Sequence, residues 1–330
     1  GSCKVLVVTG CMAQRYKNEI IEEVPEVDAV LGTTSYGDIL KAIREAMEGK
    51  HFQEFKDIDY LPEKLGKRVL TTGGHFGYLK IAEGCDKHCT YCIIPKLRGK
   101  FRSVPMERLV TQAKEMAEEG VKELILVAQE TTVYGTDIYG KKSLHILLKE
   151  LCKIKGIRWI RVLYCYPEEI YDELIQTMKE EKKICHYLDL PIQHASDRIL
   201  KRMGRRTTQA ELVEIVNKLR REIPDIVLRT TLISGFPGET QEDHKELMGF
   251  VDEMEFDRLG VFTYSPEEDT PAATMPDQVA EEVKEARRDE IMELQQEISY
   301  DKGTDRIGQE LLVMIEGKVA DESAYIGRTY

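Results

Sequence analysis

The sequence lacks a long hydrophobic run and any excess of positive charge. No apolar stretch approaches the roughly 18 residues that a membrane-spanning helix requires, so we expect no membrane span. The first residues show no charged segment followed by an apolar core, so we expect no signal peptide there. The formal net charge of −12 argues against an extensive nucleic-acid surface and favours a basic partner, although residues 96–102 and 201–206 are locally basic. Sequence repeats and low-complexity segments are also lacking, which argues against a solenoid.

The composition is typical of a globular protein. Of the 330 residues, 42% are hydrophobic and 32% are charged, enough to bury a large core. The length suits a barrel of about 200–250 residues with smaller parts attached. Of the eight cysteines, three are clustered and the others lie in hydrophobic or strand-like contexts. This pattern favours reduced, metal-binding thiols in the cytoplasm over a secreted disulfide framework.

The order of predicted elements divides the sequence into four parts. Residues 1–50 show a β-α-β-α pattern typical of the end of an α/β domain, and residues 51–77 are polar and irregular like a linker. Residues 78–303 alternate strand and helix six times, which favours a partial parallel (β/α)6 barrel over an open sheet. Residues 304–330 contain two short strands, too few for a stable sheet. We therefore expect the sequence to be truncated at both ends.

Periodicity predicts the individual elements. In the first part, strands are expected at 4–8 and 29–31 and helices at 14–24 and 38–47. The barrel strands are expected at 78–82, 123–128, 159–163, 187–190, 227–233 and 259–263. Helices are expected at 106–119, 143–153, 168–180, 196–203, 208–221, 240–253 and 278–300. The last two strands are expected at 310–317 and 324–328.

Three cysteines follow the first barrel strand. Cys85, Cys89 and Cys92 have the spacing C-x3-C-x2-C. Three thiolates can hold three irons of a [4Fe–4S] cluster and leave the fourth iron open, where S-adenosylmethionine (SAM) can chelate it through its amino and carboxylate groups. A zinc knuckle is the alternative, but zinc sites want four closing ligands, and His88 lies inside the tight loop. The spacing therefore favours the cluster.

Polar and aromatic residues recur where the barrel strands end. In a parallel barrel these ends meet at one mouth, where the active site forms. The mouth suits a zwitterionic nucleoside such as SAM. The residues expected to contact SAM are Tyr91, Gln129, Gln193, Arg229, Ser234, Gly235 and Tyr264.

Two of the polar groups near the mouth have structural alternatives. Arg229 points into the barrel if strand alternation holds, and there it can bind a SAM carboxylate or pair with an acid such as Glu130 or Asp189. His194 can transfer protons, because its reference pKa is roughly 6.5, or it can simply hold a neighbour by hydrogen bonds.

The turn at residues 234–240 also has two interpretations. Gly235 and Gly238 can let the backbone approach a ligand closely. Alternatively, the stretch is an ordinary loop that ends in a helix capped by Thr240. The neighbouring cysteine motif favours the first interpretation.

Taken together, these motifs resemble the radical SAM methylthiotransferases. The matching stretches are GCxxxCxxCIIPxxRGxxRS (84–103), AQETTxYG (128–135), PIQH (191–194) and GFPGET (235–240). The resemblance implies an N-terminal domain with a second [4Fe–4S] cluster, a radical SAM barrel, and a C-terminal TRAM β-barrel that begins at about residue 304. One departure is Val104, where the family usually has arginine.

Cys11 ends the first predicted strand. By itself it fits a small buried hydrophobic residue better than a functional group. The resemblance implies that Cys11 is the third ligand of the second cluster, with the other two ligands upstream of residue 1.

The family contains two branches with different substrates. One methylthiolates isopentenyl- or threonylcarbamoyl-adenosine in tRNA, and the other methylthiolates the β-carbon of an aspartate in a small-subunit ribosomal protein. Three features resemble the protein branch: the run from Cys92 to Ser103, the pair Gln193-His194 and the negative net charge. At the pair, the RNA branch tends to have Gln-Ser.

The resemblance also implies a mechanism. The motif cluster passes one electron to SAM, the resulting 5′-deoxyadenosyl radical removes hydrogen from the substrate, and a second SAM methylates a sulfur on the second cluster. A donor such as flavodoxin or ferredoxin would supply the electron. A non-catalytic iron–sulfur scaffold is the remaining alternative.

Overall fold

The computed structural model describes residues 3–61, 69–71, 74–320 and 322–330, and this part of the chain divides into two compact units. The first unit takes its described residues from 1–68, 83–88 and 93–102. The second takes them from 69–82, 89–92 and 103–330. The cysteine motif therefore contributes Cys85 to the first unit and Cys89 and Cys92 to the second.

The first unit is built on a three-stranded parallel sheet with the order β1-β2-β3. Ala29, Leu31 and Ala42 are fully buried, and Phe52 packs against them. Its strands are β1 (Val7–Thr9), β2 (Ala29–Leu31) and β3 (Phe52–Glu54). Its helices are α1 (Cys11–Tyr16), α2 (Glu19–Glu23), η1 (Tyr36–Asp38), α3 (Ile39–Met47) and α4 (Ile94–Arg98).

Three expectations for this unit need correction. The first strand covers Val7–Thr9 rather than residues 4–8. The helix expected at 14–24 is interrupted, because Lys17 has φ +43°, which a continuous α-helix does not accept. Phe52–Glu54 form β3 instead of linker, because Phe52 is apolar enough to join the core of the sheet. Within the predicted linker, Pro62 and Gly73 lie outside the described residues.

The second unit contains a parallel sheet of six strands in the described chain, with the order β11-β10-β9-β8-β7-β4. Each strand lies within two or three residues of its predicted position. The strands are β4 (Phe76–Lys80), β7 (Glu123–Val127), β8 (Trp159–Val162), β9 (Ile184–Asp189), β10 (Val227–Ser234) and β11 (Arg258–Thr263). Since β4 and β11 stand at the two edges, the six strands do not close into a full barrel, which agrees with the predicted partial (β/α)6 barrel.

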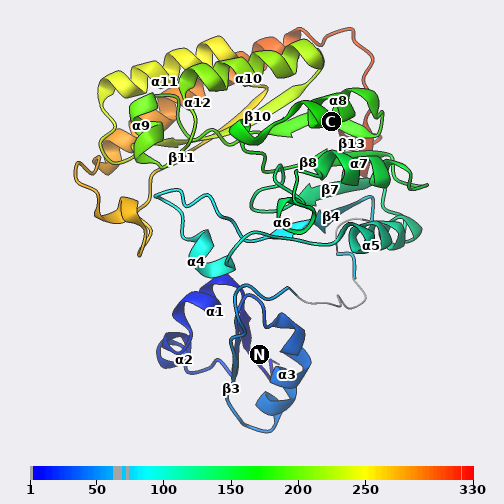
Figure 1. The fold of residues 1–330 in the computed structure, drawn as a ribbon, viewed down its shortest axis with the longest axis vertical. Helices are drawn as coiled ribbons and strands as arrows, with labels where there is room; N and C mark the ends of the chain where they lie inside the picture. Colours follow the sequence, from blue (N-terminus) through cyan, green and yellow to red (C-terminus); the bar gives the residue numbers. More distant parts are fainter. Residues whose placement is uncertain (1–2, 62–68, 72–73, 321) are drawn as a thin grey trace. The chain divides into compact units, whose positions relative to one another are not determined.

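Helices follow the strands in sequence, and α10, α11 and α12 run together along β10 and β11 (Figure 1). The predicted helix at 168–180 is divided into a 3-10 turn and an α-helix, and the charged helix lies at 281–304 rather than 278–300. The helices are α5 (Met106–Glu118), α6 (Thr136–Tyr139), α7 (Leu144–Cys152), η2 (Pro167–Glu169), α8 (Asp172–Glu180), α9 (Asp197–Arg202), α10 (Gln209–Glu222), α11 (Gln241–Met254), η3 (Pro271–Thr274) and α12 (Glu281–Thr304). In the described chain, none of the helices is long and apolar enough to cross a membrane.

Two short pairs of strands complete the chain. β5 (Ala82–Glu83) pairs with β6 (Arg102–Ser103), where the chain passes between the two units. β12 (Met314–Lys318) and β13 (Tyr325–Arg328) form the antiparallel hairpin expected near the C-terminus.

The hairpin is attached to the amino ends of the barrel strands, which we call the floor. Phe76, Glu123 and Trp159 begin three neighbouring strands in register. Arg328 pairs with Glu123, and its guanidinium carbon lies 5.8 Å from the Phe76 ring and 6.0 Å from the Trp159 ring. Tyr330 packs edge-on against Trp159, with ring centroids 5.8 Å apart. These contacts fix the end of the chain to the floor.

Candidate functional site

The inner face of the partial barrel carries the polar residues expected there. Along β10, Arg229, Thr231 and Ile233 are half-buried while the residues between them are buried, so Arg229 points inward as alternation predicts. Arg229 Nη1 donates to Asp189 Oδ1 at 2.6 Å. Burial opposes the charge of Arg229, but Asp189 raises its pKa overall. The structural pairing with Asp189 is therefore confirmed, and a contact between Arg229 and SAM stays a prediction.

The other acid considered for Arg229 is engaged elsewhere. Glu130 is buried, and its Oε1 accepts hydrogen bonds from the backbone N–H and the hydroxyl of Thr132. The neighbouring Gln129, expected to contact SAM, is half-buried directly after β7.

A loop of the second unit carries Cys89 and Cys92, and Thr90 holds it in place. The Thr90 N–H donates to Met203 O at 2.9 Å, and its hydroxyl donates to Arg202 O at 2.9 Å. The Thr90 carbonyl accepts from Ala272 N–H at 2.9 Å. Carbonyls at a helix C-terminus lack helical partners, and here they hold the cysteine loop against the end of α9. The sequence analysis did not single out Thr90.

The two thiols of this loop form no disulfide and are largely enclosed. Cys89 is buried and Cys92 is half-buried. The Cys89 Sγ lies 3.5 Å from the hydroxyl of Tyr166, which follows β8. In the first unit Cys85 is also buried and in no disulfide, and its N–H donates to Gly99 O at 3.2 Å.

The glycine before Cys85 is required by the backbone. Gly84 has φ +80°, and a Cβ there would lie 2.1 Å from Lys100 O. A side chain would therefore collide with main chain, and only glycine allows the motif to begin here.

The donor set of the motif suits an iron–sulfur cluster. Throughout the described chain, no three His, Cys, Asp or Glu side chains converge as the ligands of one ion would. A [4Fe–4S] cluster takes each thiolate on a different iron, so its ligands need not meet at one point. The thiols of Cys85, Cys89 and Cys92 are in no disulfide, and thiolates are the ligands that such a cluster uses.

Two aromatic residues predicted to contact SAM lie in one cluster. Tyr91 meets Phe236 edge-on with ring centroids 6.3 Å apart, and Phe236 meets Tyr264 at 5.3 Å. Ile199 and Met203 pack with them. The Tyr264 hydroxyl is buried without a hydrogen-bond partner among the described residues, and burial raises its pKa. The structure thus brings Tyr91 and Tyr264 together through Phe236. The sequence analysis named Phe236 only within the GFPGET stretch and predicted no contact for it.

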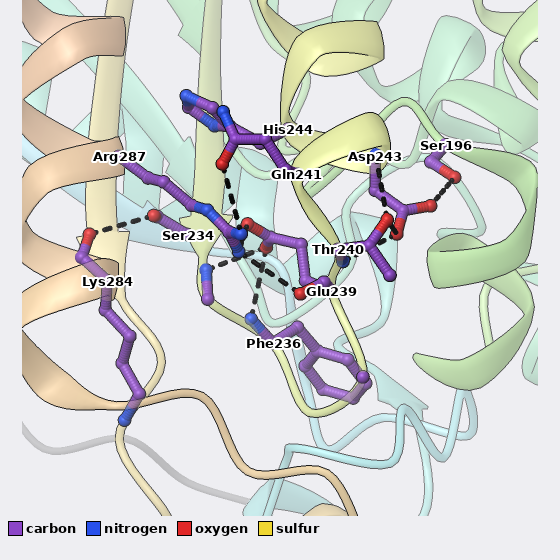
Figure 2. Close-up of polar contacts among 12 residues, drawn as sticks. Ser196, Ser234, Phe236, Glu239, Thr240, Gln241, Asp243, His244, Lys284 and Arg287 are labelled. Carbon is purple, nitrogen blue, oxygen red and sulfur yellow. Dashed lines mark hydrogen bonds and ion pairs between the residues drawn. The ribbon is translucent and has the colours of Figure 1, made fainter.

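The turn after β10 is organised by a buried carboxylate (Figure 2). Glu239 Oε2 accepts from Gly235 N–H at 2.7 Å and from Phe236 N–H at 3.2 Å. Its Oε1 accepts from Arg287 Nη1 of α12 at 2.9 Å. Burial opposes ionisation of Glu239, but His194, Arg287 and the Gly235 N–H together lower its pKa. An ionised Glu239 therefore fixes the shape of the turn.

The residues of this turn have structural reasons of their own. Ser234 is buried and donates its hydroxyl to Lys284 O at 3.0 Å (Figure 2). Gly235 has φ +71°, and a Cβ there would lie 2.2 Å from Lys284 Cγ. A Cβ at Gly238 would lie 2.9 Å from the Arg202 guanidinium carbon. The side chains of Lys284 and Arg202 therefore lie where the glycines were expected to let a ligand approach. Contacts of Ser234 and Gly235 with SAM stay predictions.

The helix cap expected at Thr240 is confirmed. Thr240 and Asp243 form a reciprocal capping box at the start of α11. Asp243 also accepts from the Ser196 hydroxyl at 2.7 Å and pairs with Arg198 (Figure 2 shows the Ser196 contact).

His194 holds its neighbours. It is fully buried, its Nδ1 accepts from Ser196 N–H at 2.9 Å, and its Nε2 lies 3.5 Å from Glu239 Oε2. An accepting Nδ1 leaves the proton on Nε2, which points to Glu239. The structural alternative for His194 therefore accounts for its contacts.

Gln193 stands on strained backbone at the mouth. Its φ is +73°, a left-handed conformation that non-glycine residues rarely adopt. Its N–H donates to Thr231 O at 2.9 Å and its carbonyl accepts from Ile233 N–H at 2.8 Å, so β10 holds this conformation. Such strain gathers at functional sites, and a contact between Gln193 and SAM stays a prediction.

In the first unit, Cys11 is more than a buried apolar residue. It begins α1 directly after β1, and it is half-buried. Its Sγ accepts from Arg98 Nε at 3.2 Å, and Arg98 Nη1 lies 3.5 Å from Glu83. The arginine of the cysteine motif therefore contacts the one cysteine that the resemblance assigns to a second cluster.

Comparisons with known proteins agree with these motifs. A family model described as "Radical SAM superfamily" matches residues 79–251. A protein of Lachnoclostridium phytofermentans named "Ribosomal protein uS12 methylthiotransferase RimO" is 64% identical over 330 residues, covering 100% of this chain and 75% of the relative. A Clostridium perfringens protein of the same name is 54% identical over 331 residues, covering 100% of this chain and 74% of that protein.

Solved structures confirm the fold. The radical enzyme OxsB, described as cobalamin-dependent and bound to S-adenosylmethionine, matches with a TM-score of 0.54 and 14% identity, covering 90% of this chain and 43% of that one. The methyltransferase TsrM from Kitasatospora setae, with cobalamin and a [4Fe-4S] cluster bound, matches with a TM-score of 0.51 and 16% identity. The match covers 60% of this chain and 38% of TsrM. At these identities the likeness shows the fold alone.

Proposed function

Because the chain belongs to the family of ribosomal protein uS12 methylthiotransferases named RimO, we propose that it adds a methylthio group to the β-carbon of an aspartate in that ribosomal protein. The observation that carries the proposal is 64% identity over the whole chain to a protein of that name. The C-x3-C-x2-C motif, part of which Thr90 holds against α9, supplies the thiolate ligands of the iron–sulfur cluster that this reaction requires. The acidic net charge of −12 also suits a basic ribosomal protein.

In this proposal Cys85, Cys89 and Cys92 hold a [4Fe–4S] cluster whose open iron takes SAM. When bound, the cluster and SAM supply the one-electron chemistry that removes hydrogen from an unactivated carbon. The contribution of the chain is to hold the thiolates and to orient what binds beside them. Thr90 performs the first task, because its three hydrogen bonds fix the loop that carries two of the cysteines.

The remaining residues at the mouth orient SAM and exclude water. The Tyr91, Phe236 and Tyr264 rings form an apolar wall directly beside the cysteine loop. Arg229, already oriented by Asp189, and Gln193, fixed by β10, present polar groups inside the barrel. A wall on one side and fixed polar groups on the other suit a nucleoside with a charged amino-acid end.

Cys11 is proposed as a ligand of the second cluster, which is the site of the transferred sulfur. Arg98 would stabilise its thiolate, since it already donates to Cys11 Sγ. The hairpin of β12 and β13 is proposed as the start of a TRAM barrel. A cytoplasmic location is also part of the proposal, and the proposed ribosomal substrate supports it. An electron donor such as flavodoxin or ferredoxin completes the proposal.

The substrate can be tested by direct competition. The full-length enzyme, reduced and supplied with SAM, is given a peptide from the aspartate loop of the ribosomal protein together with a tRNA that carries isopentenyl-adenosine. We expect mass spectrometry to find the methylthio group on the peptide and none on a control peptide with asparagine in place of the aspartate. Methylthio incorporation into the tRNA alone would refute the protein substrate and favour the RNA branch.

Catalysis itself has a simpler test. Only a radical SAM enzyme converts SAM to 5′-deoxyadenosine under reducing conditions, whereas a scaffold protein does not. We expect the reconstituted parent to form this product and Cys89→Ala to form none. A parent that carries the cluster but leaves SAM intact would support the scaffold instead.

A further inference from the structure

Arg205 is a buried cation with unused hydrogen-bond donors. It lies three residues beyond the end of α9, and its side chain is 1% exposed. Its Nη2 lies 3.4 Å from Glu168 Oε2, while its Nε and Nη1 have no partner among the described residues. Burying a charge is costly unless it is paired and hydrogen-bonded, so these two nitrogens call for an acceptor.

Arg205 is linked to Cys89 through Tyr166 and through the backbone of the cysteine loop. The Arg205 guanidinium carbon lies 4.2 Å from the centre of the Tyr166 ring, and the hydroxyl of Tyr166 lies 3.5 Å from Cys89 Sγ. The backbone makes a second link, because the Thr90 N–H donates to Met203 O, two residues before Arg205. The cation is thus tied to a predicted iron ligand by a side chain and by the main chain.

The surroundings keep Arg205 charged. Burial disfavours the charged form, but Glu168 and then the neighbouring Tyr91, Tyr166 and Cys89 raise the pKa of Arg205 above its usual value. These neighbours therefore favour the charged form of Arg205. Because the site is buried, that charge acts on its neighbours with little solvent screening.

We propose that Arg205 is a positioning residue for the iron–sulfur cluster, and that its buried charge stabilises the reduced cluster and raises its reduction potential. The inference rests on the proposed function, because it requires a cluster on Cys85, Cys89 and Cys92. Reduction adds one electron to a cluster that is already surrounded by thiolates, so a nearby cation favours the reduced form. The free Nε and Nη1 donors are suited to the sulfur atoms of the cluster.

The test measures the midpoint potential of the cluster without SAM. The chain carries Cys11→Ala so that no second cluster contributes, and it is titrated with dithionite and redox mediators while the reduced cluster is followed by electron paramagnetic resonance. Arg205→Gln should shift the midpoint to more negative values, and Arg205→Lys, which keeps the charge, should shift it much less. Arg206→Gln is the matched control: it removes an exposed charge from the next residue and should leave the midpoint unchanged.

A second variant keeps the test decisive if Arg205→Gln assembles no cluster. Glu168→Gln removes the carboxylate that partly neutralises Arg205, so it should shift the midpoint in the opposite direction, to more positive values. An unchanged midpoint in Arg205→Gln would overturn the inference, and so would an unchanged midpoint in Glu168→Gln if Arg205→Gln assembles no cluster. An equal shift in Arg205→Lys and Arg205→Gln would also overturn it. A parent without any cluster would instead refute the proposed function.

Discussion

The two ends of the barrel sheet differ in how far the protein itself pairs a buried charge. At the floor, the fully buried carboxylate of Glu123 accepts hydrogen bonds from both Arg161 and Arg328, although Arg161 Nη2 has no partner among the described residues. At the mouth, two nitrogens of buried Arg205 and the hydroxyl of Tyr264 have no partner in the described chain. A charge whose partners come from the protein stabilises the fold, whereas unused buried donors are available to a ligand. The mouth therefore offers more unused donors than the Glu123 site does.

The backbone is strained at both ends of the sheet, but for different reasons. Tyr164 and Gln193 follow β8 and β9 at the mouth and have φ values of +58° and +73°. Each left-handed non-glycine residue costs about 1–3 kcal/mol, which the surrounding hydrogen bonds must offset. At the floor, Glu255 has φ +40° because it caps the C-terminus of α11 before β11 begins. Helix termination explains Glu255, whereas Tyr164 and Gln193 lie among the polar residues of the mouth.

The largest expected effect is at the mouth. Cys89→Ala should abolish the visible absorbance of the reconstituted cluster, because one iron loses its thiolate. The matched control is Cys185→Ala, which removes another buried thiol, from β9. That variant should reconstitute like the parent. If Cys89→Ala also reconstitutes fully, the three-ligand assignment is wrong.

At the floor we expect an effect on stability instead of the cluster. Glu123→Gln leaves Arg161 and Arg328 without their common carboxylate, and breaking a buried ion pair costs about 3–5 kcal/mol. Urea unfolding of the apoprotein measures this loss. Glu150→Gln, which removes an exposed partner of Lys153, should cost less than about 1 kcal/mol. Equal losses in the two variants would show that the floor pair is not structural.

The turn at the mouth is sensitive to a single methyl group. Gly235→Ala should destabilise the protein by about 2–4 kcal/mol, because it combines a left-handed residue with overlap on Lys284. Gly249→Ala is the control: it lies in α11 with open space around it and should stabilise the helix by about 0.5–1 kcal/mol. Thermal unfolding of the two apoproteins should therefore change in opposite directions. A Gly235→Ala variant as stable as the parent contradicts the packing against Lys284.

The smallest effect depends on pH. Burial opposes ionisation of Asp243, but the Thr240 N–H, Arg198 and Ser196 lower its pKa to about 2, from 3.8. A lowered pKa in the folded state contributes stability above about pH 4 that is lost as the pH falls toward 2. Asp243→Asn should therefore cost about 2 kcal/mol at pH 7, converted at about 1.4 kcal/mol per pKa unit.

Urea midpoints of the apoprotein between pH 7 and pH 3 measure this dependence. The difference between the parent and Asp243→Asn should shrink below about pH 4. Asp252→Asn, exposed on the same helix, should show little difference at any pH. A difference that stays constant with pH would show that the charge of Asp243 is not what stabilises this cap.

Local patterns in the sequence predicted the elements and the chemistry. Strand periodicity places the six barrel strands within two or three residues, because alternation and helical period are properties of neighbouring residues. The spacing of Cys85, Cys89 and Cys92 predicts the cluster for the same reason. The sequence pattern placed Phe52–Glu54 in a linker. The strand forms because Phe52 packs with Ala29 and Leu31, which lie far from it in the sequence.

Only the tertiary structure decided what the side chains around the motifs do. The sequence places Arg205 in a basic run, yet its charge is buried on Tyr166, which lies 39 positions earlier in the printed sequence. The glycine pattern at the turn predicts close approach, yet the neighbour of Gly235 is Lys284 of α12. Such pairs are distant along the chain and carry no common period. They meet because the strands close into a sheet and the helices cover it, and packing alone determines which groups end as partners.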